Sequence, residues 1–196
     1  MRRGHVYLRK APVLLHLIQG RMEGMSKTVV VIGSMVSAMV LTLAIGTAWA
    51  SIECTASSAC RGTDGPNTMY GSTSEDRIYG KGGSDVIDAT GGVDELYGGD
   101  GPDAGLYGGN GRDLVRGGAG QDKAIGGSGA DTMRGGKGRD ELWGEGVADT
   151  LYGGPDNDIL HSSRDGKAPN TVGGGGGFDI CYVDKYDRVK GCEREY

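Results

Sequence analysis

The stretch GGAGQDKAIGGSGADTMRGGKGRDELW, Gly117 to Trp143, contains three consecutive nine-residue units of nearly the same sequence. Each unit opens Gly-Gly-x-Gly-x-Asp and closes with three residues, of which the middle one is apolar. One buried residue between two exposed ones predicts a three-residue strand. The six glycine-rich residues before it predict the turn that leads from one strand to the next.

The same register extends in both directions from this stretch. Eleven units tile Gly62 to His161, one of them with an insertion near Ala104, and a twelfth spans Gly174 to Tyr182. Position 8 is apolar in every unit, and position 6 is aspartate in every unit except one, which has Asn67. Such a repeat is typical of an all-β solenoid, in which each short strand pairs in parallel with its copies.

Stacking the strands also stacks the turns and brings their aspartates together. A row of carboxylates repels itself unless cations lie between them. Ca²⁺ takes about six to eight oxygen ligands, which aspartate carboxylates and the carbonyl groups of glycine-rich turns can supply. We therefore predict several bound Ca²⁺ ions and no other cofactor. The predicted metal ligands are Asp76, Asp85, Asp94, Asp103, Asp113, Asp122, Asp131, Asp140, Asp149, Asp158 and Asp179.

Six units carry the full hexamer: GGDGPD, GGNGRD, GGAGQD, GGSGAD, GGKGRD and GGGGFD. The sequence resembles the RTX, or hemolysin-type calcium-binding, nonapeptide repeat. The resemblance implies a parallel β-roll (a β-solenoid) with two nonapeptides per coil and Ca²⁺ between turns stacked on the same edge. Eleven contiguous units then make five to six coils. By the same resemblance the Asp103 turn pairs with the Asp122 turn, and the Asp113 turn with the Asp131 turn.

Four cysteines follow residue 50: Cys54, Cys60, Cys181 and Cys192. An even number of cysteines in an exported segment indicates two disulfides. Proximity in sequence favours Cys54–Cys60 and Cys181–Cys192, although four cysteines allow three pairings. A zinc site is disfavoured because neither pair has the C-x₂₋₄-C spacing and only one histidine follows residue 50.

The apolar run Thr28 to Ala50 follows Lys27 and ends in Ala-Trp-Ala. This is the layout of a secretory signal peptide with cleavage after Ala50, so we expect a secreted, extracellular protein. The run is also long enough to span a bilayer, so an uncleaved N-terminal anchor is the alternative. Met22 or Met25 is a more natural start for such a signal than Met1.

The expected organisation has five parts along the chain. Disulfide-tied caps flank the roll, and a loop interrupts the repeats before the last unit. The parts are 1–50, the N-terminal extension and signal peptide; 51–61, the N-terminal cap; 62–161, the calcium-binding β-roll; 162–173, an inserted loop; and 174–196, the last repeat and C-terminal cap.

The charge balance bears on the partners. The chain has a net charge of −5, but its first fifty residues hold six of the 21 basic and one of the 26 acidic residues. The remainder carries 15 basic and 25 acidic residues, which suits cations and argues against nucleic acid and anionic lipid as partners. We expect calcium and an unidentified extracellular or cell-surface partner, with membrane contact only if the N-terminal segment stays uncleaved.

We expect no enzyme activity and no catalytic residue, because the segments outside the repeats are short. His161, Ser162, Ser163 and Asp165 are neighbours in sequence, but a catalytic triad is assembled by fold geometry rather than by adjacency. The leading hypothesis is an exported calcium-binding roll with a structural or interaction role. The alternatives are a calcium-dependent adhesion or ligand-binding module of a cell-surface assembly and, third, a remnant or accessory of a secreted RTX-type hydrolase or toxin.

The first testable prediction concerns processing. Because Ala48-Trp49-Ala50 provides a small-x-small cleavage site, the exported protein should begin at Ser51. The intact mass and N-terminal peptide of protein recovered from the culture medium check this. Recovery of the uncut segment 29–50 in the membrane fraction would favour the anchor instead.

Overall fold

The computed structural model describes residues 51–54, 59–162 and 168–196. The predicted signal peptide and the alternative start sites lie outside these residues. Within the described part of the chain, no helix has the length and apolar character needed to cross a membrane.

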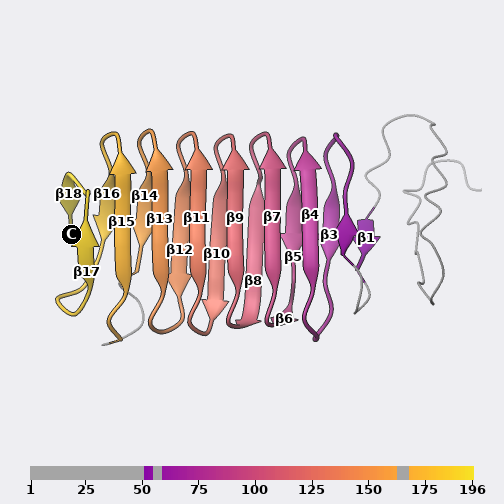
Figure 1. Ribbon diagram of the computed structural model, residues 1–196, viewed down its shortest axis with the longest axis horizontal. Helices are drawn as coiled ribbons and strands as arrows, with labels where there is room; N and C mark the ends of the chain where they lie inside the picture. The colour runs from indigo at the N-terminus through magenta and orange to yellow at the C-terminus, as the bar shows by residue number, and fades with distance from the viewer. Residues whose placement is uncertain (1–50, 55–58, 163–167) are drawn as a thin grey trace, which may run out of the picture.

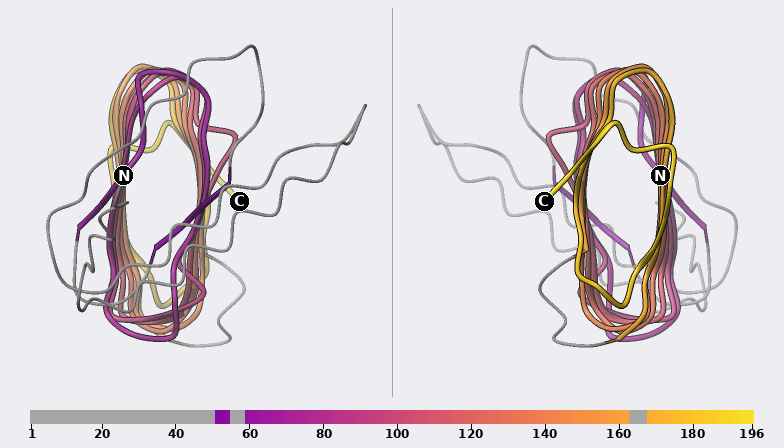
Figure 2. Two further views of the ribbon diagram at one scale, coloured as in Figure 1. Left: turned by 90° about the vertical axis from the view of Figure 1, so that its right-hand side faces the viewer. Right: turned by 90° about the vertical axis from the view of Figure 1, so that its left-hand side faces the viewer.

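The chain winds as a solenoid whose successive strands alternate between two facing sheets (Figure 1). Pairing within each sheet is parallel, and the strands of one sheet run opposite to those of the other. Viewed along the stacking axis, the coils superpose as a flattened ring (Figure 2). Glu141 pairs with Lys123 eighteen residues earlier, so two nonapeptides make one coil, as the RTX resemblance implies. The predicted all-β parallel β-roll is therefore confirmed.

Sheet A is the sheet that contains β1, and sheet B is the facing sheet that contains β2. Sheet A contains β1 (Ser51–Glu53), β3 (Thr68–Tyr70), β5 (Val86–Asp88), β8 (Gly105–Gly111), β10 (Lys123–Ser128), β12 (Glu141–Glu145), β14 (Ile159–His161), β16 (Ile180–Tyr182) and β18 (Arg194–Glu195), with β6 (Gly91–Gly92) beside β8. Sheet B contains β2 (Cys60–Arg61), β4 (Arg77–Gly82), β7 (Glu95–Asp100), β9 (Leu114–Ala119), β11 (Thr132–Lys137), β13 (Thr150–Pro155), β15 (Thr171–Gly176) and β17 (Arg188–Lys190).

The core is a double column of position-8 side chains, one column from each sheet. Leu142 of β12 lies between Ala124 and Leu160 in register, and each of the three is fully buried. Sheet B contributes the facing column, in which Met133 pairs with Val115 and Leu151. One apolar side chain per nonapeptide is a thin core, so burial of apolar surface supplies only part of the stability.

Many strands are longer than the three residues predicted. In sheet B, strand β9 runs on through Gly117 and Gly118 to Ala119, because the glycine backbone of one turn pairs with that of the next coil. The roll is also longer than the contiguous repeats imply. Sheet B has eight strands, so there are about eight coils instead of five to six. Residues 171–173, at the end of the segment expected to be an inserted loop, begin β15.

Disulfides join Cys54 to Cys60 and Cys181 to Cys192, which confirms the local pairing. Cys54 and Cys181 are buried and belong to the same apolar cluster as the central leucines, and Cys60 and Cys192 pack against it. Each disulfide therefore covers one end of the apolar column. A solenoid needs such caps because its terminal coils have a neighbour on one side only.

Glycine at position 1 allows a close approach between coils. A Cβ added at Gly126 would lie 2.6 Å from Oδ2 of Asp131 and 3.0 Å from the carbonyl oxygen of Gly144 in the next coil. Gly176, at the end of β15, is a natural contrast, because no heavy atom lies within 4 Å of its added Cβ.

We therefore predict that Gly126→Ala destabilises the folded roll by about 1–3 kcal/mol, the range typical of overpacking. Gly176→Ala is the matched control and should leave stability unchanged or raise it slightly, because alanine restricts the unfolded chain. Denaturant unfolding in millimolar Ca²⁺ measures both. Equal effects of the two substitutions would show that the contacts of Gly126 do not limit packing.

Candidate calcium-binding ladders

The predicted aspartates lie side by side in two ladders, one along each turn edge of the roll. All are buried, with relative exposures of 0 to 5%. Each ladder takes one aspartate per coil, immediately before a strand except at Asp103, where Ala104 precedes β8. The ladder leading into sheet A contains Asp85, Asp103, Asp122, Asp140, Asp158 and Asp179. The ladder leading into sheet B contains Asp76, Asp94, Asp113, Asp131 and Asp149.

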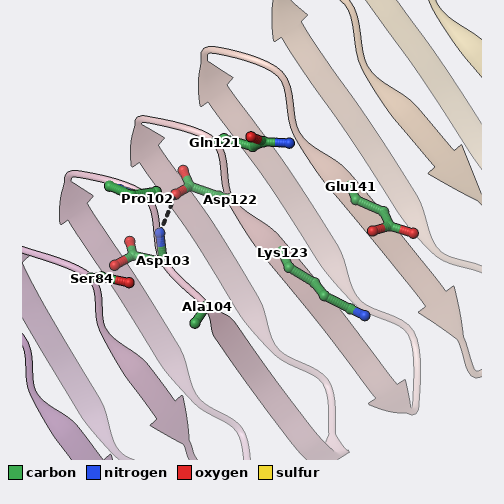
Figure 3. Close-up of a pocket in the computed structure, with 8 residues that line it drawn as sticks. All are labelled: Ser84, Pro102, Asp103, Ala104, Gln121, Asp122, Lys123 and Glu141. Carbon is green, nitrogen blue, oxygen red and sulfur yellow. Dashed lines mark hydrogen bonds between the residues drawn. The ribbon is translucent and has the colours of Figure 1, made fainter.

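Each ladder is held by one repeated hydrogen bond. The backbone N–H of Asp103 donates to Oδ1 of Asp122 over 2.9 Å, and Figure 3 shows this contact. The N–H of Asp122 donates in turn to Oδ1 of Asp140, also over 2.9 Å. The Asp113 N–H donates to Oδ1 of Asp131 over 2.8 Å. The turn pairs that the RTX resemblance implied, Asp103 with Asp122 and Asp113 with Asp131, are therefore neighbours in the structure.

The second carboxylate oxygen has a different environment. Within the described residues, the buried Oδ2 atom accepts no hydrogen bond in most ladder aspartates. This holds for Asp85, Asp94, Asp103, Asp113, Asp122, Asp131, Asp140, Asp158 and Asp179. A buried charged oxygen without a partner is strongly unfavourable, so this oxygen requires a proton or a cation.

Burial raises the pKa of these carboxyl groups. It raises the pKa of Asp103, Asp131, Asp140 and Asp158 to about 7, and that of Asp94 to about 6. The backbone N–H bond to each carboxylate opposes this shift, and the neighbouring aspartates of the same ladder add to it. Loss of hydration is the largest cause in each case, which is the situation a bound cation corrects.

Backbone carbonyl groups lie beside these oxygens. The point where a Cβ of Gly108 would stand is 2.7 Å from Oδ2 of Asp113 and 2.6 Å from the carbonyl oxygen of Gly126. Among the described residues, no three acidic, histidine or cysteine side chains converge on one point. A metal here must therefore take a large share of its ligands from carbonyl oxygens. Such a donor set fits Ca²⁺ and excludes a structural zinc site.

The ladders end in residues that close them by hydrogen bonds. In the first sheet B turn, Oδ2 of Asp76 accepts the N–H of Ser72 over 2.6 Å and its hydroxyl over 2.9 Å. In the first sheet A turn, Oδ1 of Asn67 accepts the N–H of Thr63 over 2.6 Å. Asp76 thus occupies a predicted ligand position, but its carboxylate is already satisfied by its own turn.

Three further members of the ladders escaped the sequence reasoning. Asn170 continues the sheet B ladder, because its Oδ1 accepts the Asp149 N–H over 2.7 Å, and Asp187 follows it through a 2.9 Å bond. Glu193 ends the sheet A ladder by accepting the Asp179 N–H over 2.7 Å. The sequence gives only a weak sign of Asn170: residues 170–173 match positions 6 to 9 of the repeat, but the glycine-rich residues that open a repeat do not precede them.

A comparison with family models matches the RTX calcium-binding nonapeptide repeat in four copies, at residues 61–96, 70–104, 107–142 and 125–160. Together the matches cover half of the chain. The chain belongs to this family. No curated protein and no solved structure matches it. RTX repeats bind calcium, so the β-roll is a structural calcium-binding arrangement, and the two aspartate ladders are where its turns meet.

His161 and Ser162, which are neighbours in sequence, contact different residues of the RTX roll. The His161 ring stacks between those of Trp143 and Tyr182, with centroids 3.6 and 4.5 Å away. The Ser162 hydroxyl donates instead to Oδ2 of Asp187 over 2.8 Å. These neighbours in sequence are therefore committed to different partners. Ser163 and Asp165 lie outside the described residues.

The raised carboxyl pKa values predict how the calcium-free roll responds to pH. Their folded values lie above the ordinary aspartate value of about 4, so the folded state favours the protonated groups. The stability they contribute is fully present below about pH 4 and is lost as the pH rises through about 7. Circular dichroism of protein freed of calcium should therefore show more β signal at pH 5 than at pH 8. A larger β signal at pH 8 would contradict the carboxyl environment described.

Proposed function

We propose that this protein is an exported, non-enzymatic calcium-binding β-roll that folds as Ca²⁺ binds between its turns and has a structural or interaction role outside the cytoplasm. The supporting observation is the row of buried Oδ2 atoms without hydrogen-bond partners along each ladder. A cation would neutralise these oxygens and use the nearby glycine carbonyls as further ligands.

The ligands we propose are the eleven predicted aspartates, with a distinction among them. The central members, such as Asp103, Asp122 and Asp140, have an unsatisfied oxygen and aspartate neighbours on both sides in the ladder. Asp76 is the least suited, since Ser72 already supplies two hydrogen bonds to its Oδ2. Asp149 borders Asn170, which brings an amide instead of a second carboxylate.

Coupling between binding and folding follows from the thin core. Each nonapeptide buries only one apolar side chain, which does not offset the backbone freedom that its nine residues lose on folding. The free energy of metal binding therefore contributes directly to the free energy of folding, as in other small metal-dependent folds. Export is supported by the signal-like segment before Ser51 and by the two disulfides, which persist in oxidising compartments.

Far-ultraviolet circular dichroism of the purified protein tests this function. With a chelator the β signal should be small, and millimolar Ca²⁺ should restore it. Mg²⁺ should substitute poorly, because it requires a smaller octahedral site and keeps its waters. A chelated protein with the full β signal that Ca²⁺ does not change would contradict the proposal.

A single substitution then tests the ladder itself. Asp122→Asn keeps an oxygen for the Asp103 N–H but removes the charge shared by two turn pairs, so the midpoint of the Ca²⁺ transition should rise about tenfold. Asp100→Asn is the matched control, because it makes the same change of charge at an exposed residue that lies at the end of β7 and outside the ladders. Equal midpoints for the two variants would remove Asp122 from the ligand set.

A further inference from the structure

The outer face of sheet B carries a concentration of positive charge. Positions 7 and 9 of its strands hold six basic residues and one acidic residue: Arg61, Arg77, Arg116, Arg134, Arg188, Lys190 and Glu95. Glu95 is already engaged, because its carboxylate accepts two bonds from Arg77, at 2.6 and 2.7 Å. We call these seven residues the basic face. Apart from Arg77, its basic residues form no salt bridge with a carboxylate in the described part of the chain.

The acidic balance of the chain does not cancel this face. Eleven of the 25 acidic residues after residue 50 are the predicted ladder aspartates, which are buried at the turn edges, and Asp187 and Glu193 also belong to the ladders. Outside the ladders, 12 acidic residues remain against 15 basic ones. Once cations neutralise the ladders, the acidic residues elsewhere no longer outnumber the basic ones, and the basic face keeps its charge.

The position-9 side chains of this face form a single column along the stack. From β2 to β13 it reads Arg61, Tyr79, Tyr97, Arg116, Arg134, Tyr152 in successive strands. The guanidinium of Arg116 lies over the Tyr97 ring at 5.4 Å from its centroid, and that of Arg134 over the Tyr152 ring at 5.6 Å. The two guanidinium groups therefore stack on rings that lie on opposite sides of the pair.

Arg116 and Arg134 place two like charges next to each other on this face. They are direct register partners on neighbouring strands β9 and β11, which lie side by side in Figure 1. Like charges directly opposite each other in a sheet are destabilising. The two cation–π contacts offset part of this repulsion, and an oxyanion placed between the two guanidinium groups would neutralise it and accept hydrogen bonds from both.

We propose that the basic face of sheet B binds a linear acidic polysaccharide, with Arg116 and Arg134 as the central pair that holds one of its sulfate or carboxylate groups. Hydroxyl groups line the column on its other side, where Thr132, Thr150 and Thr171 pair in register. Such a row suits a polyhydroxyl chain that runs along the stack. Because the face exists only in the folded roll, this inference rests on the calcium-dependent folding proposed above.

The same geometry disfavours other polyanions. Binding of single-stranded nucleic acid relies on open aromatic faces for base stacking. Here Tyr79 and Tyr97 stack on each other at 4.7 Å, and arginines cover their remaining faces, so the rings offer edges to a partner. A bilayer would also meet the turn edges beside the sheet, where the exposed acidic residues Asp100 and Asp156 lie.

Retention of the full-length protein on dextran sulfate in millimolar Ca²⁺ tests the inference, with neutral dextran as the uncharged reference. Arg116→Gln/Arg134→Gln should lower the affinity about tenfold or more, because each guanidinium contributes charge-assisted bonds. The matched control is Arg112→Gln/Arg139→Gln, which removes two exposed arginines from turns outside the face and should change affinity less than about threefold.

Circular dichroism of each variant in Ca²⁺ separates folding from binding. A protein that shows the β signal in Ca²⁺ but binds dextran sulfate no better than dextran would overturn this inference and leave the calcium function standing. Equal losses in the two double variants would also overturn it, as would tighter binding to oligonucleotides or to phosphatidylserine vesicles. Absence of any calcium-dependent β signal would instead contradict the proposed function.

Discussion

The buried carboxylate is the constraint on which the rest of the roll depends. Apart from Asp76, the predicted ladder aspartates each use one oxygen to accept a backbone N–H from the preceding coil, as Asp122 does from Asp103, and so fix the register between coils. In the central members, such as Asp103, Asp122 and Asp140, the other oxygen is buried beside glycine backbone without a hydrogen-bond partner. The same side chain thus aligns the turns and creates the demand for a cation. The aspartate at position 6 therefore determines both the alignment of the coils and the binding of metal.

The ends of the molecule meet this constraint in another way. At the N-terminal end, the side-chain oxygens of Asn67 and Asp76 accept hydrogen bonds from their own turns. At the other end, the Asn170 amide donates to Asp187, so a neutral donor stands beside a carboxylate. Disulfides then cover both ends of the apolar column. The terminal coils are thereby stabilised by hydrogen bonds and covalent links, and the central coils depend most on ligation.

The roll also separates charge by location. Negative charge is concentrated in the turn-edge ladders, where it is buried, and sheet B presents a mostly basic outer surface. Sheet A differs, because the Trp143, His161 and Tyr182 rings stack along its surface and cover one another's faces. In sheet B, Tyr79 and Tyr97 likewise stack on each other, and the Arg134 guanidinium lies over the Tyr152 ring.

Much of this protein follows from its sequence alone, because a nonapeptide repeated in phase leaves few arrangements. The apolar residue at position 8, the aspartate at position 6 and the glycines between them predict parallel stacking, a buried column and rows of carboxylates, and the nearest cysteines are joined. Only the tertiary structure identified the ladder members at the C-terminal end, because the coils there differ in length. Asn170, Asp187 and Glu193 enter the ladders at spacings of 21, 17 and 14 residues, which no fixed period identifies. The basic face is also a tertiary property. Odd and even repeats go to opposite sheets, so Arg116 and Arg134, two repeats apart in the chain, become register partners on one surface.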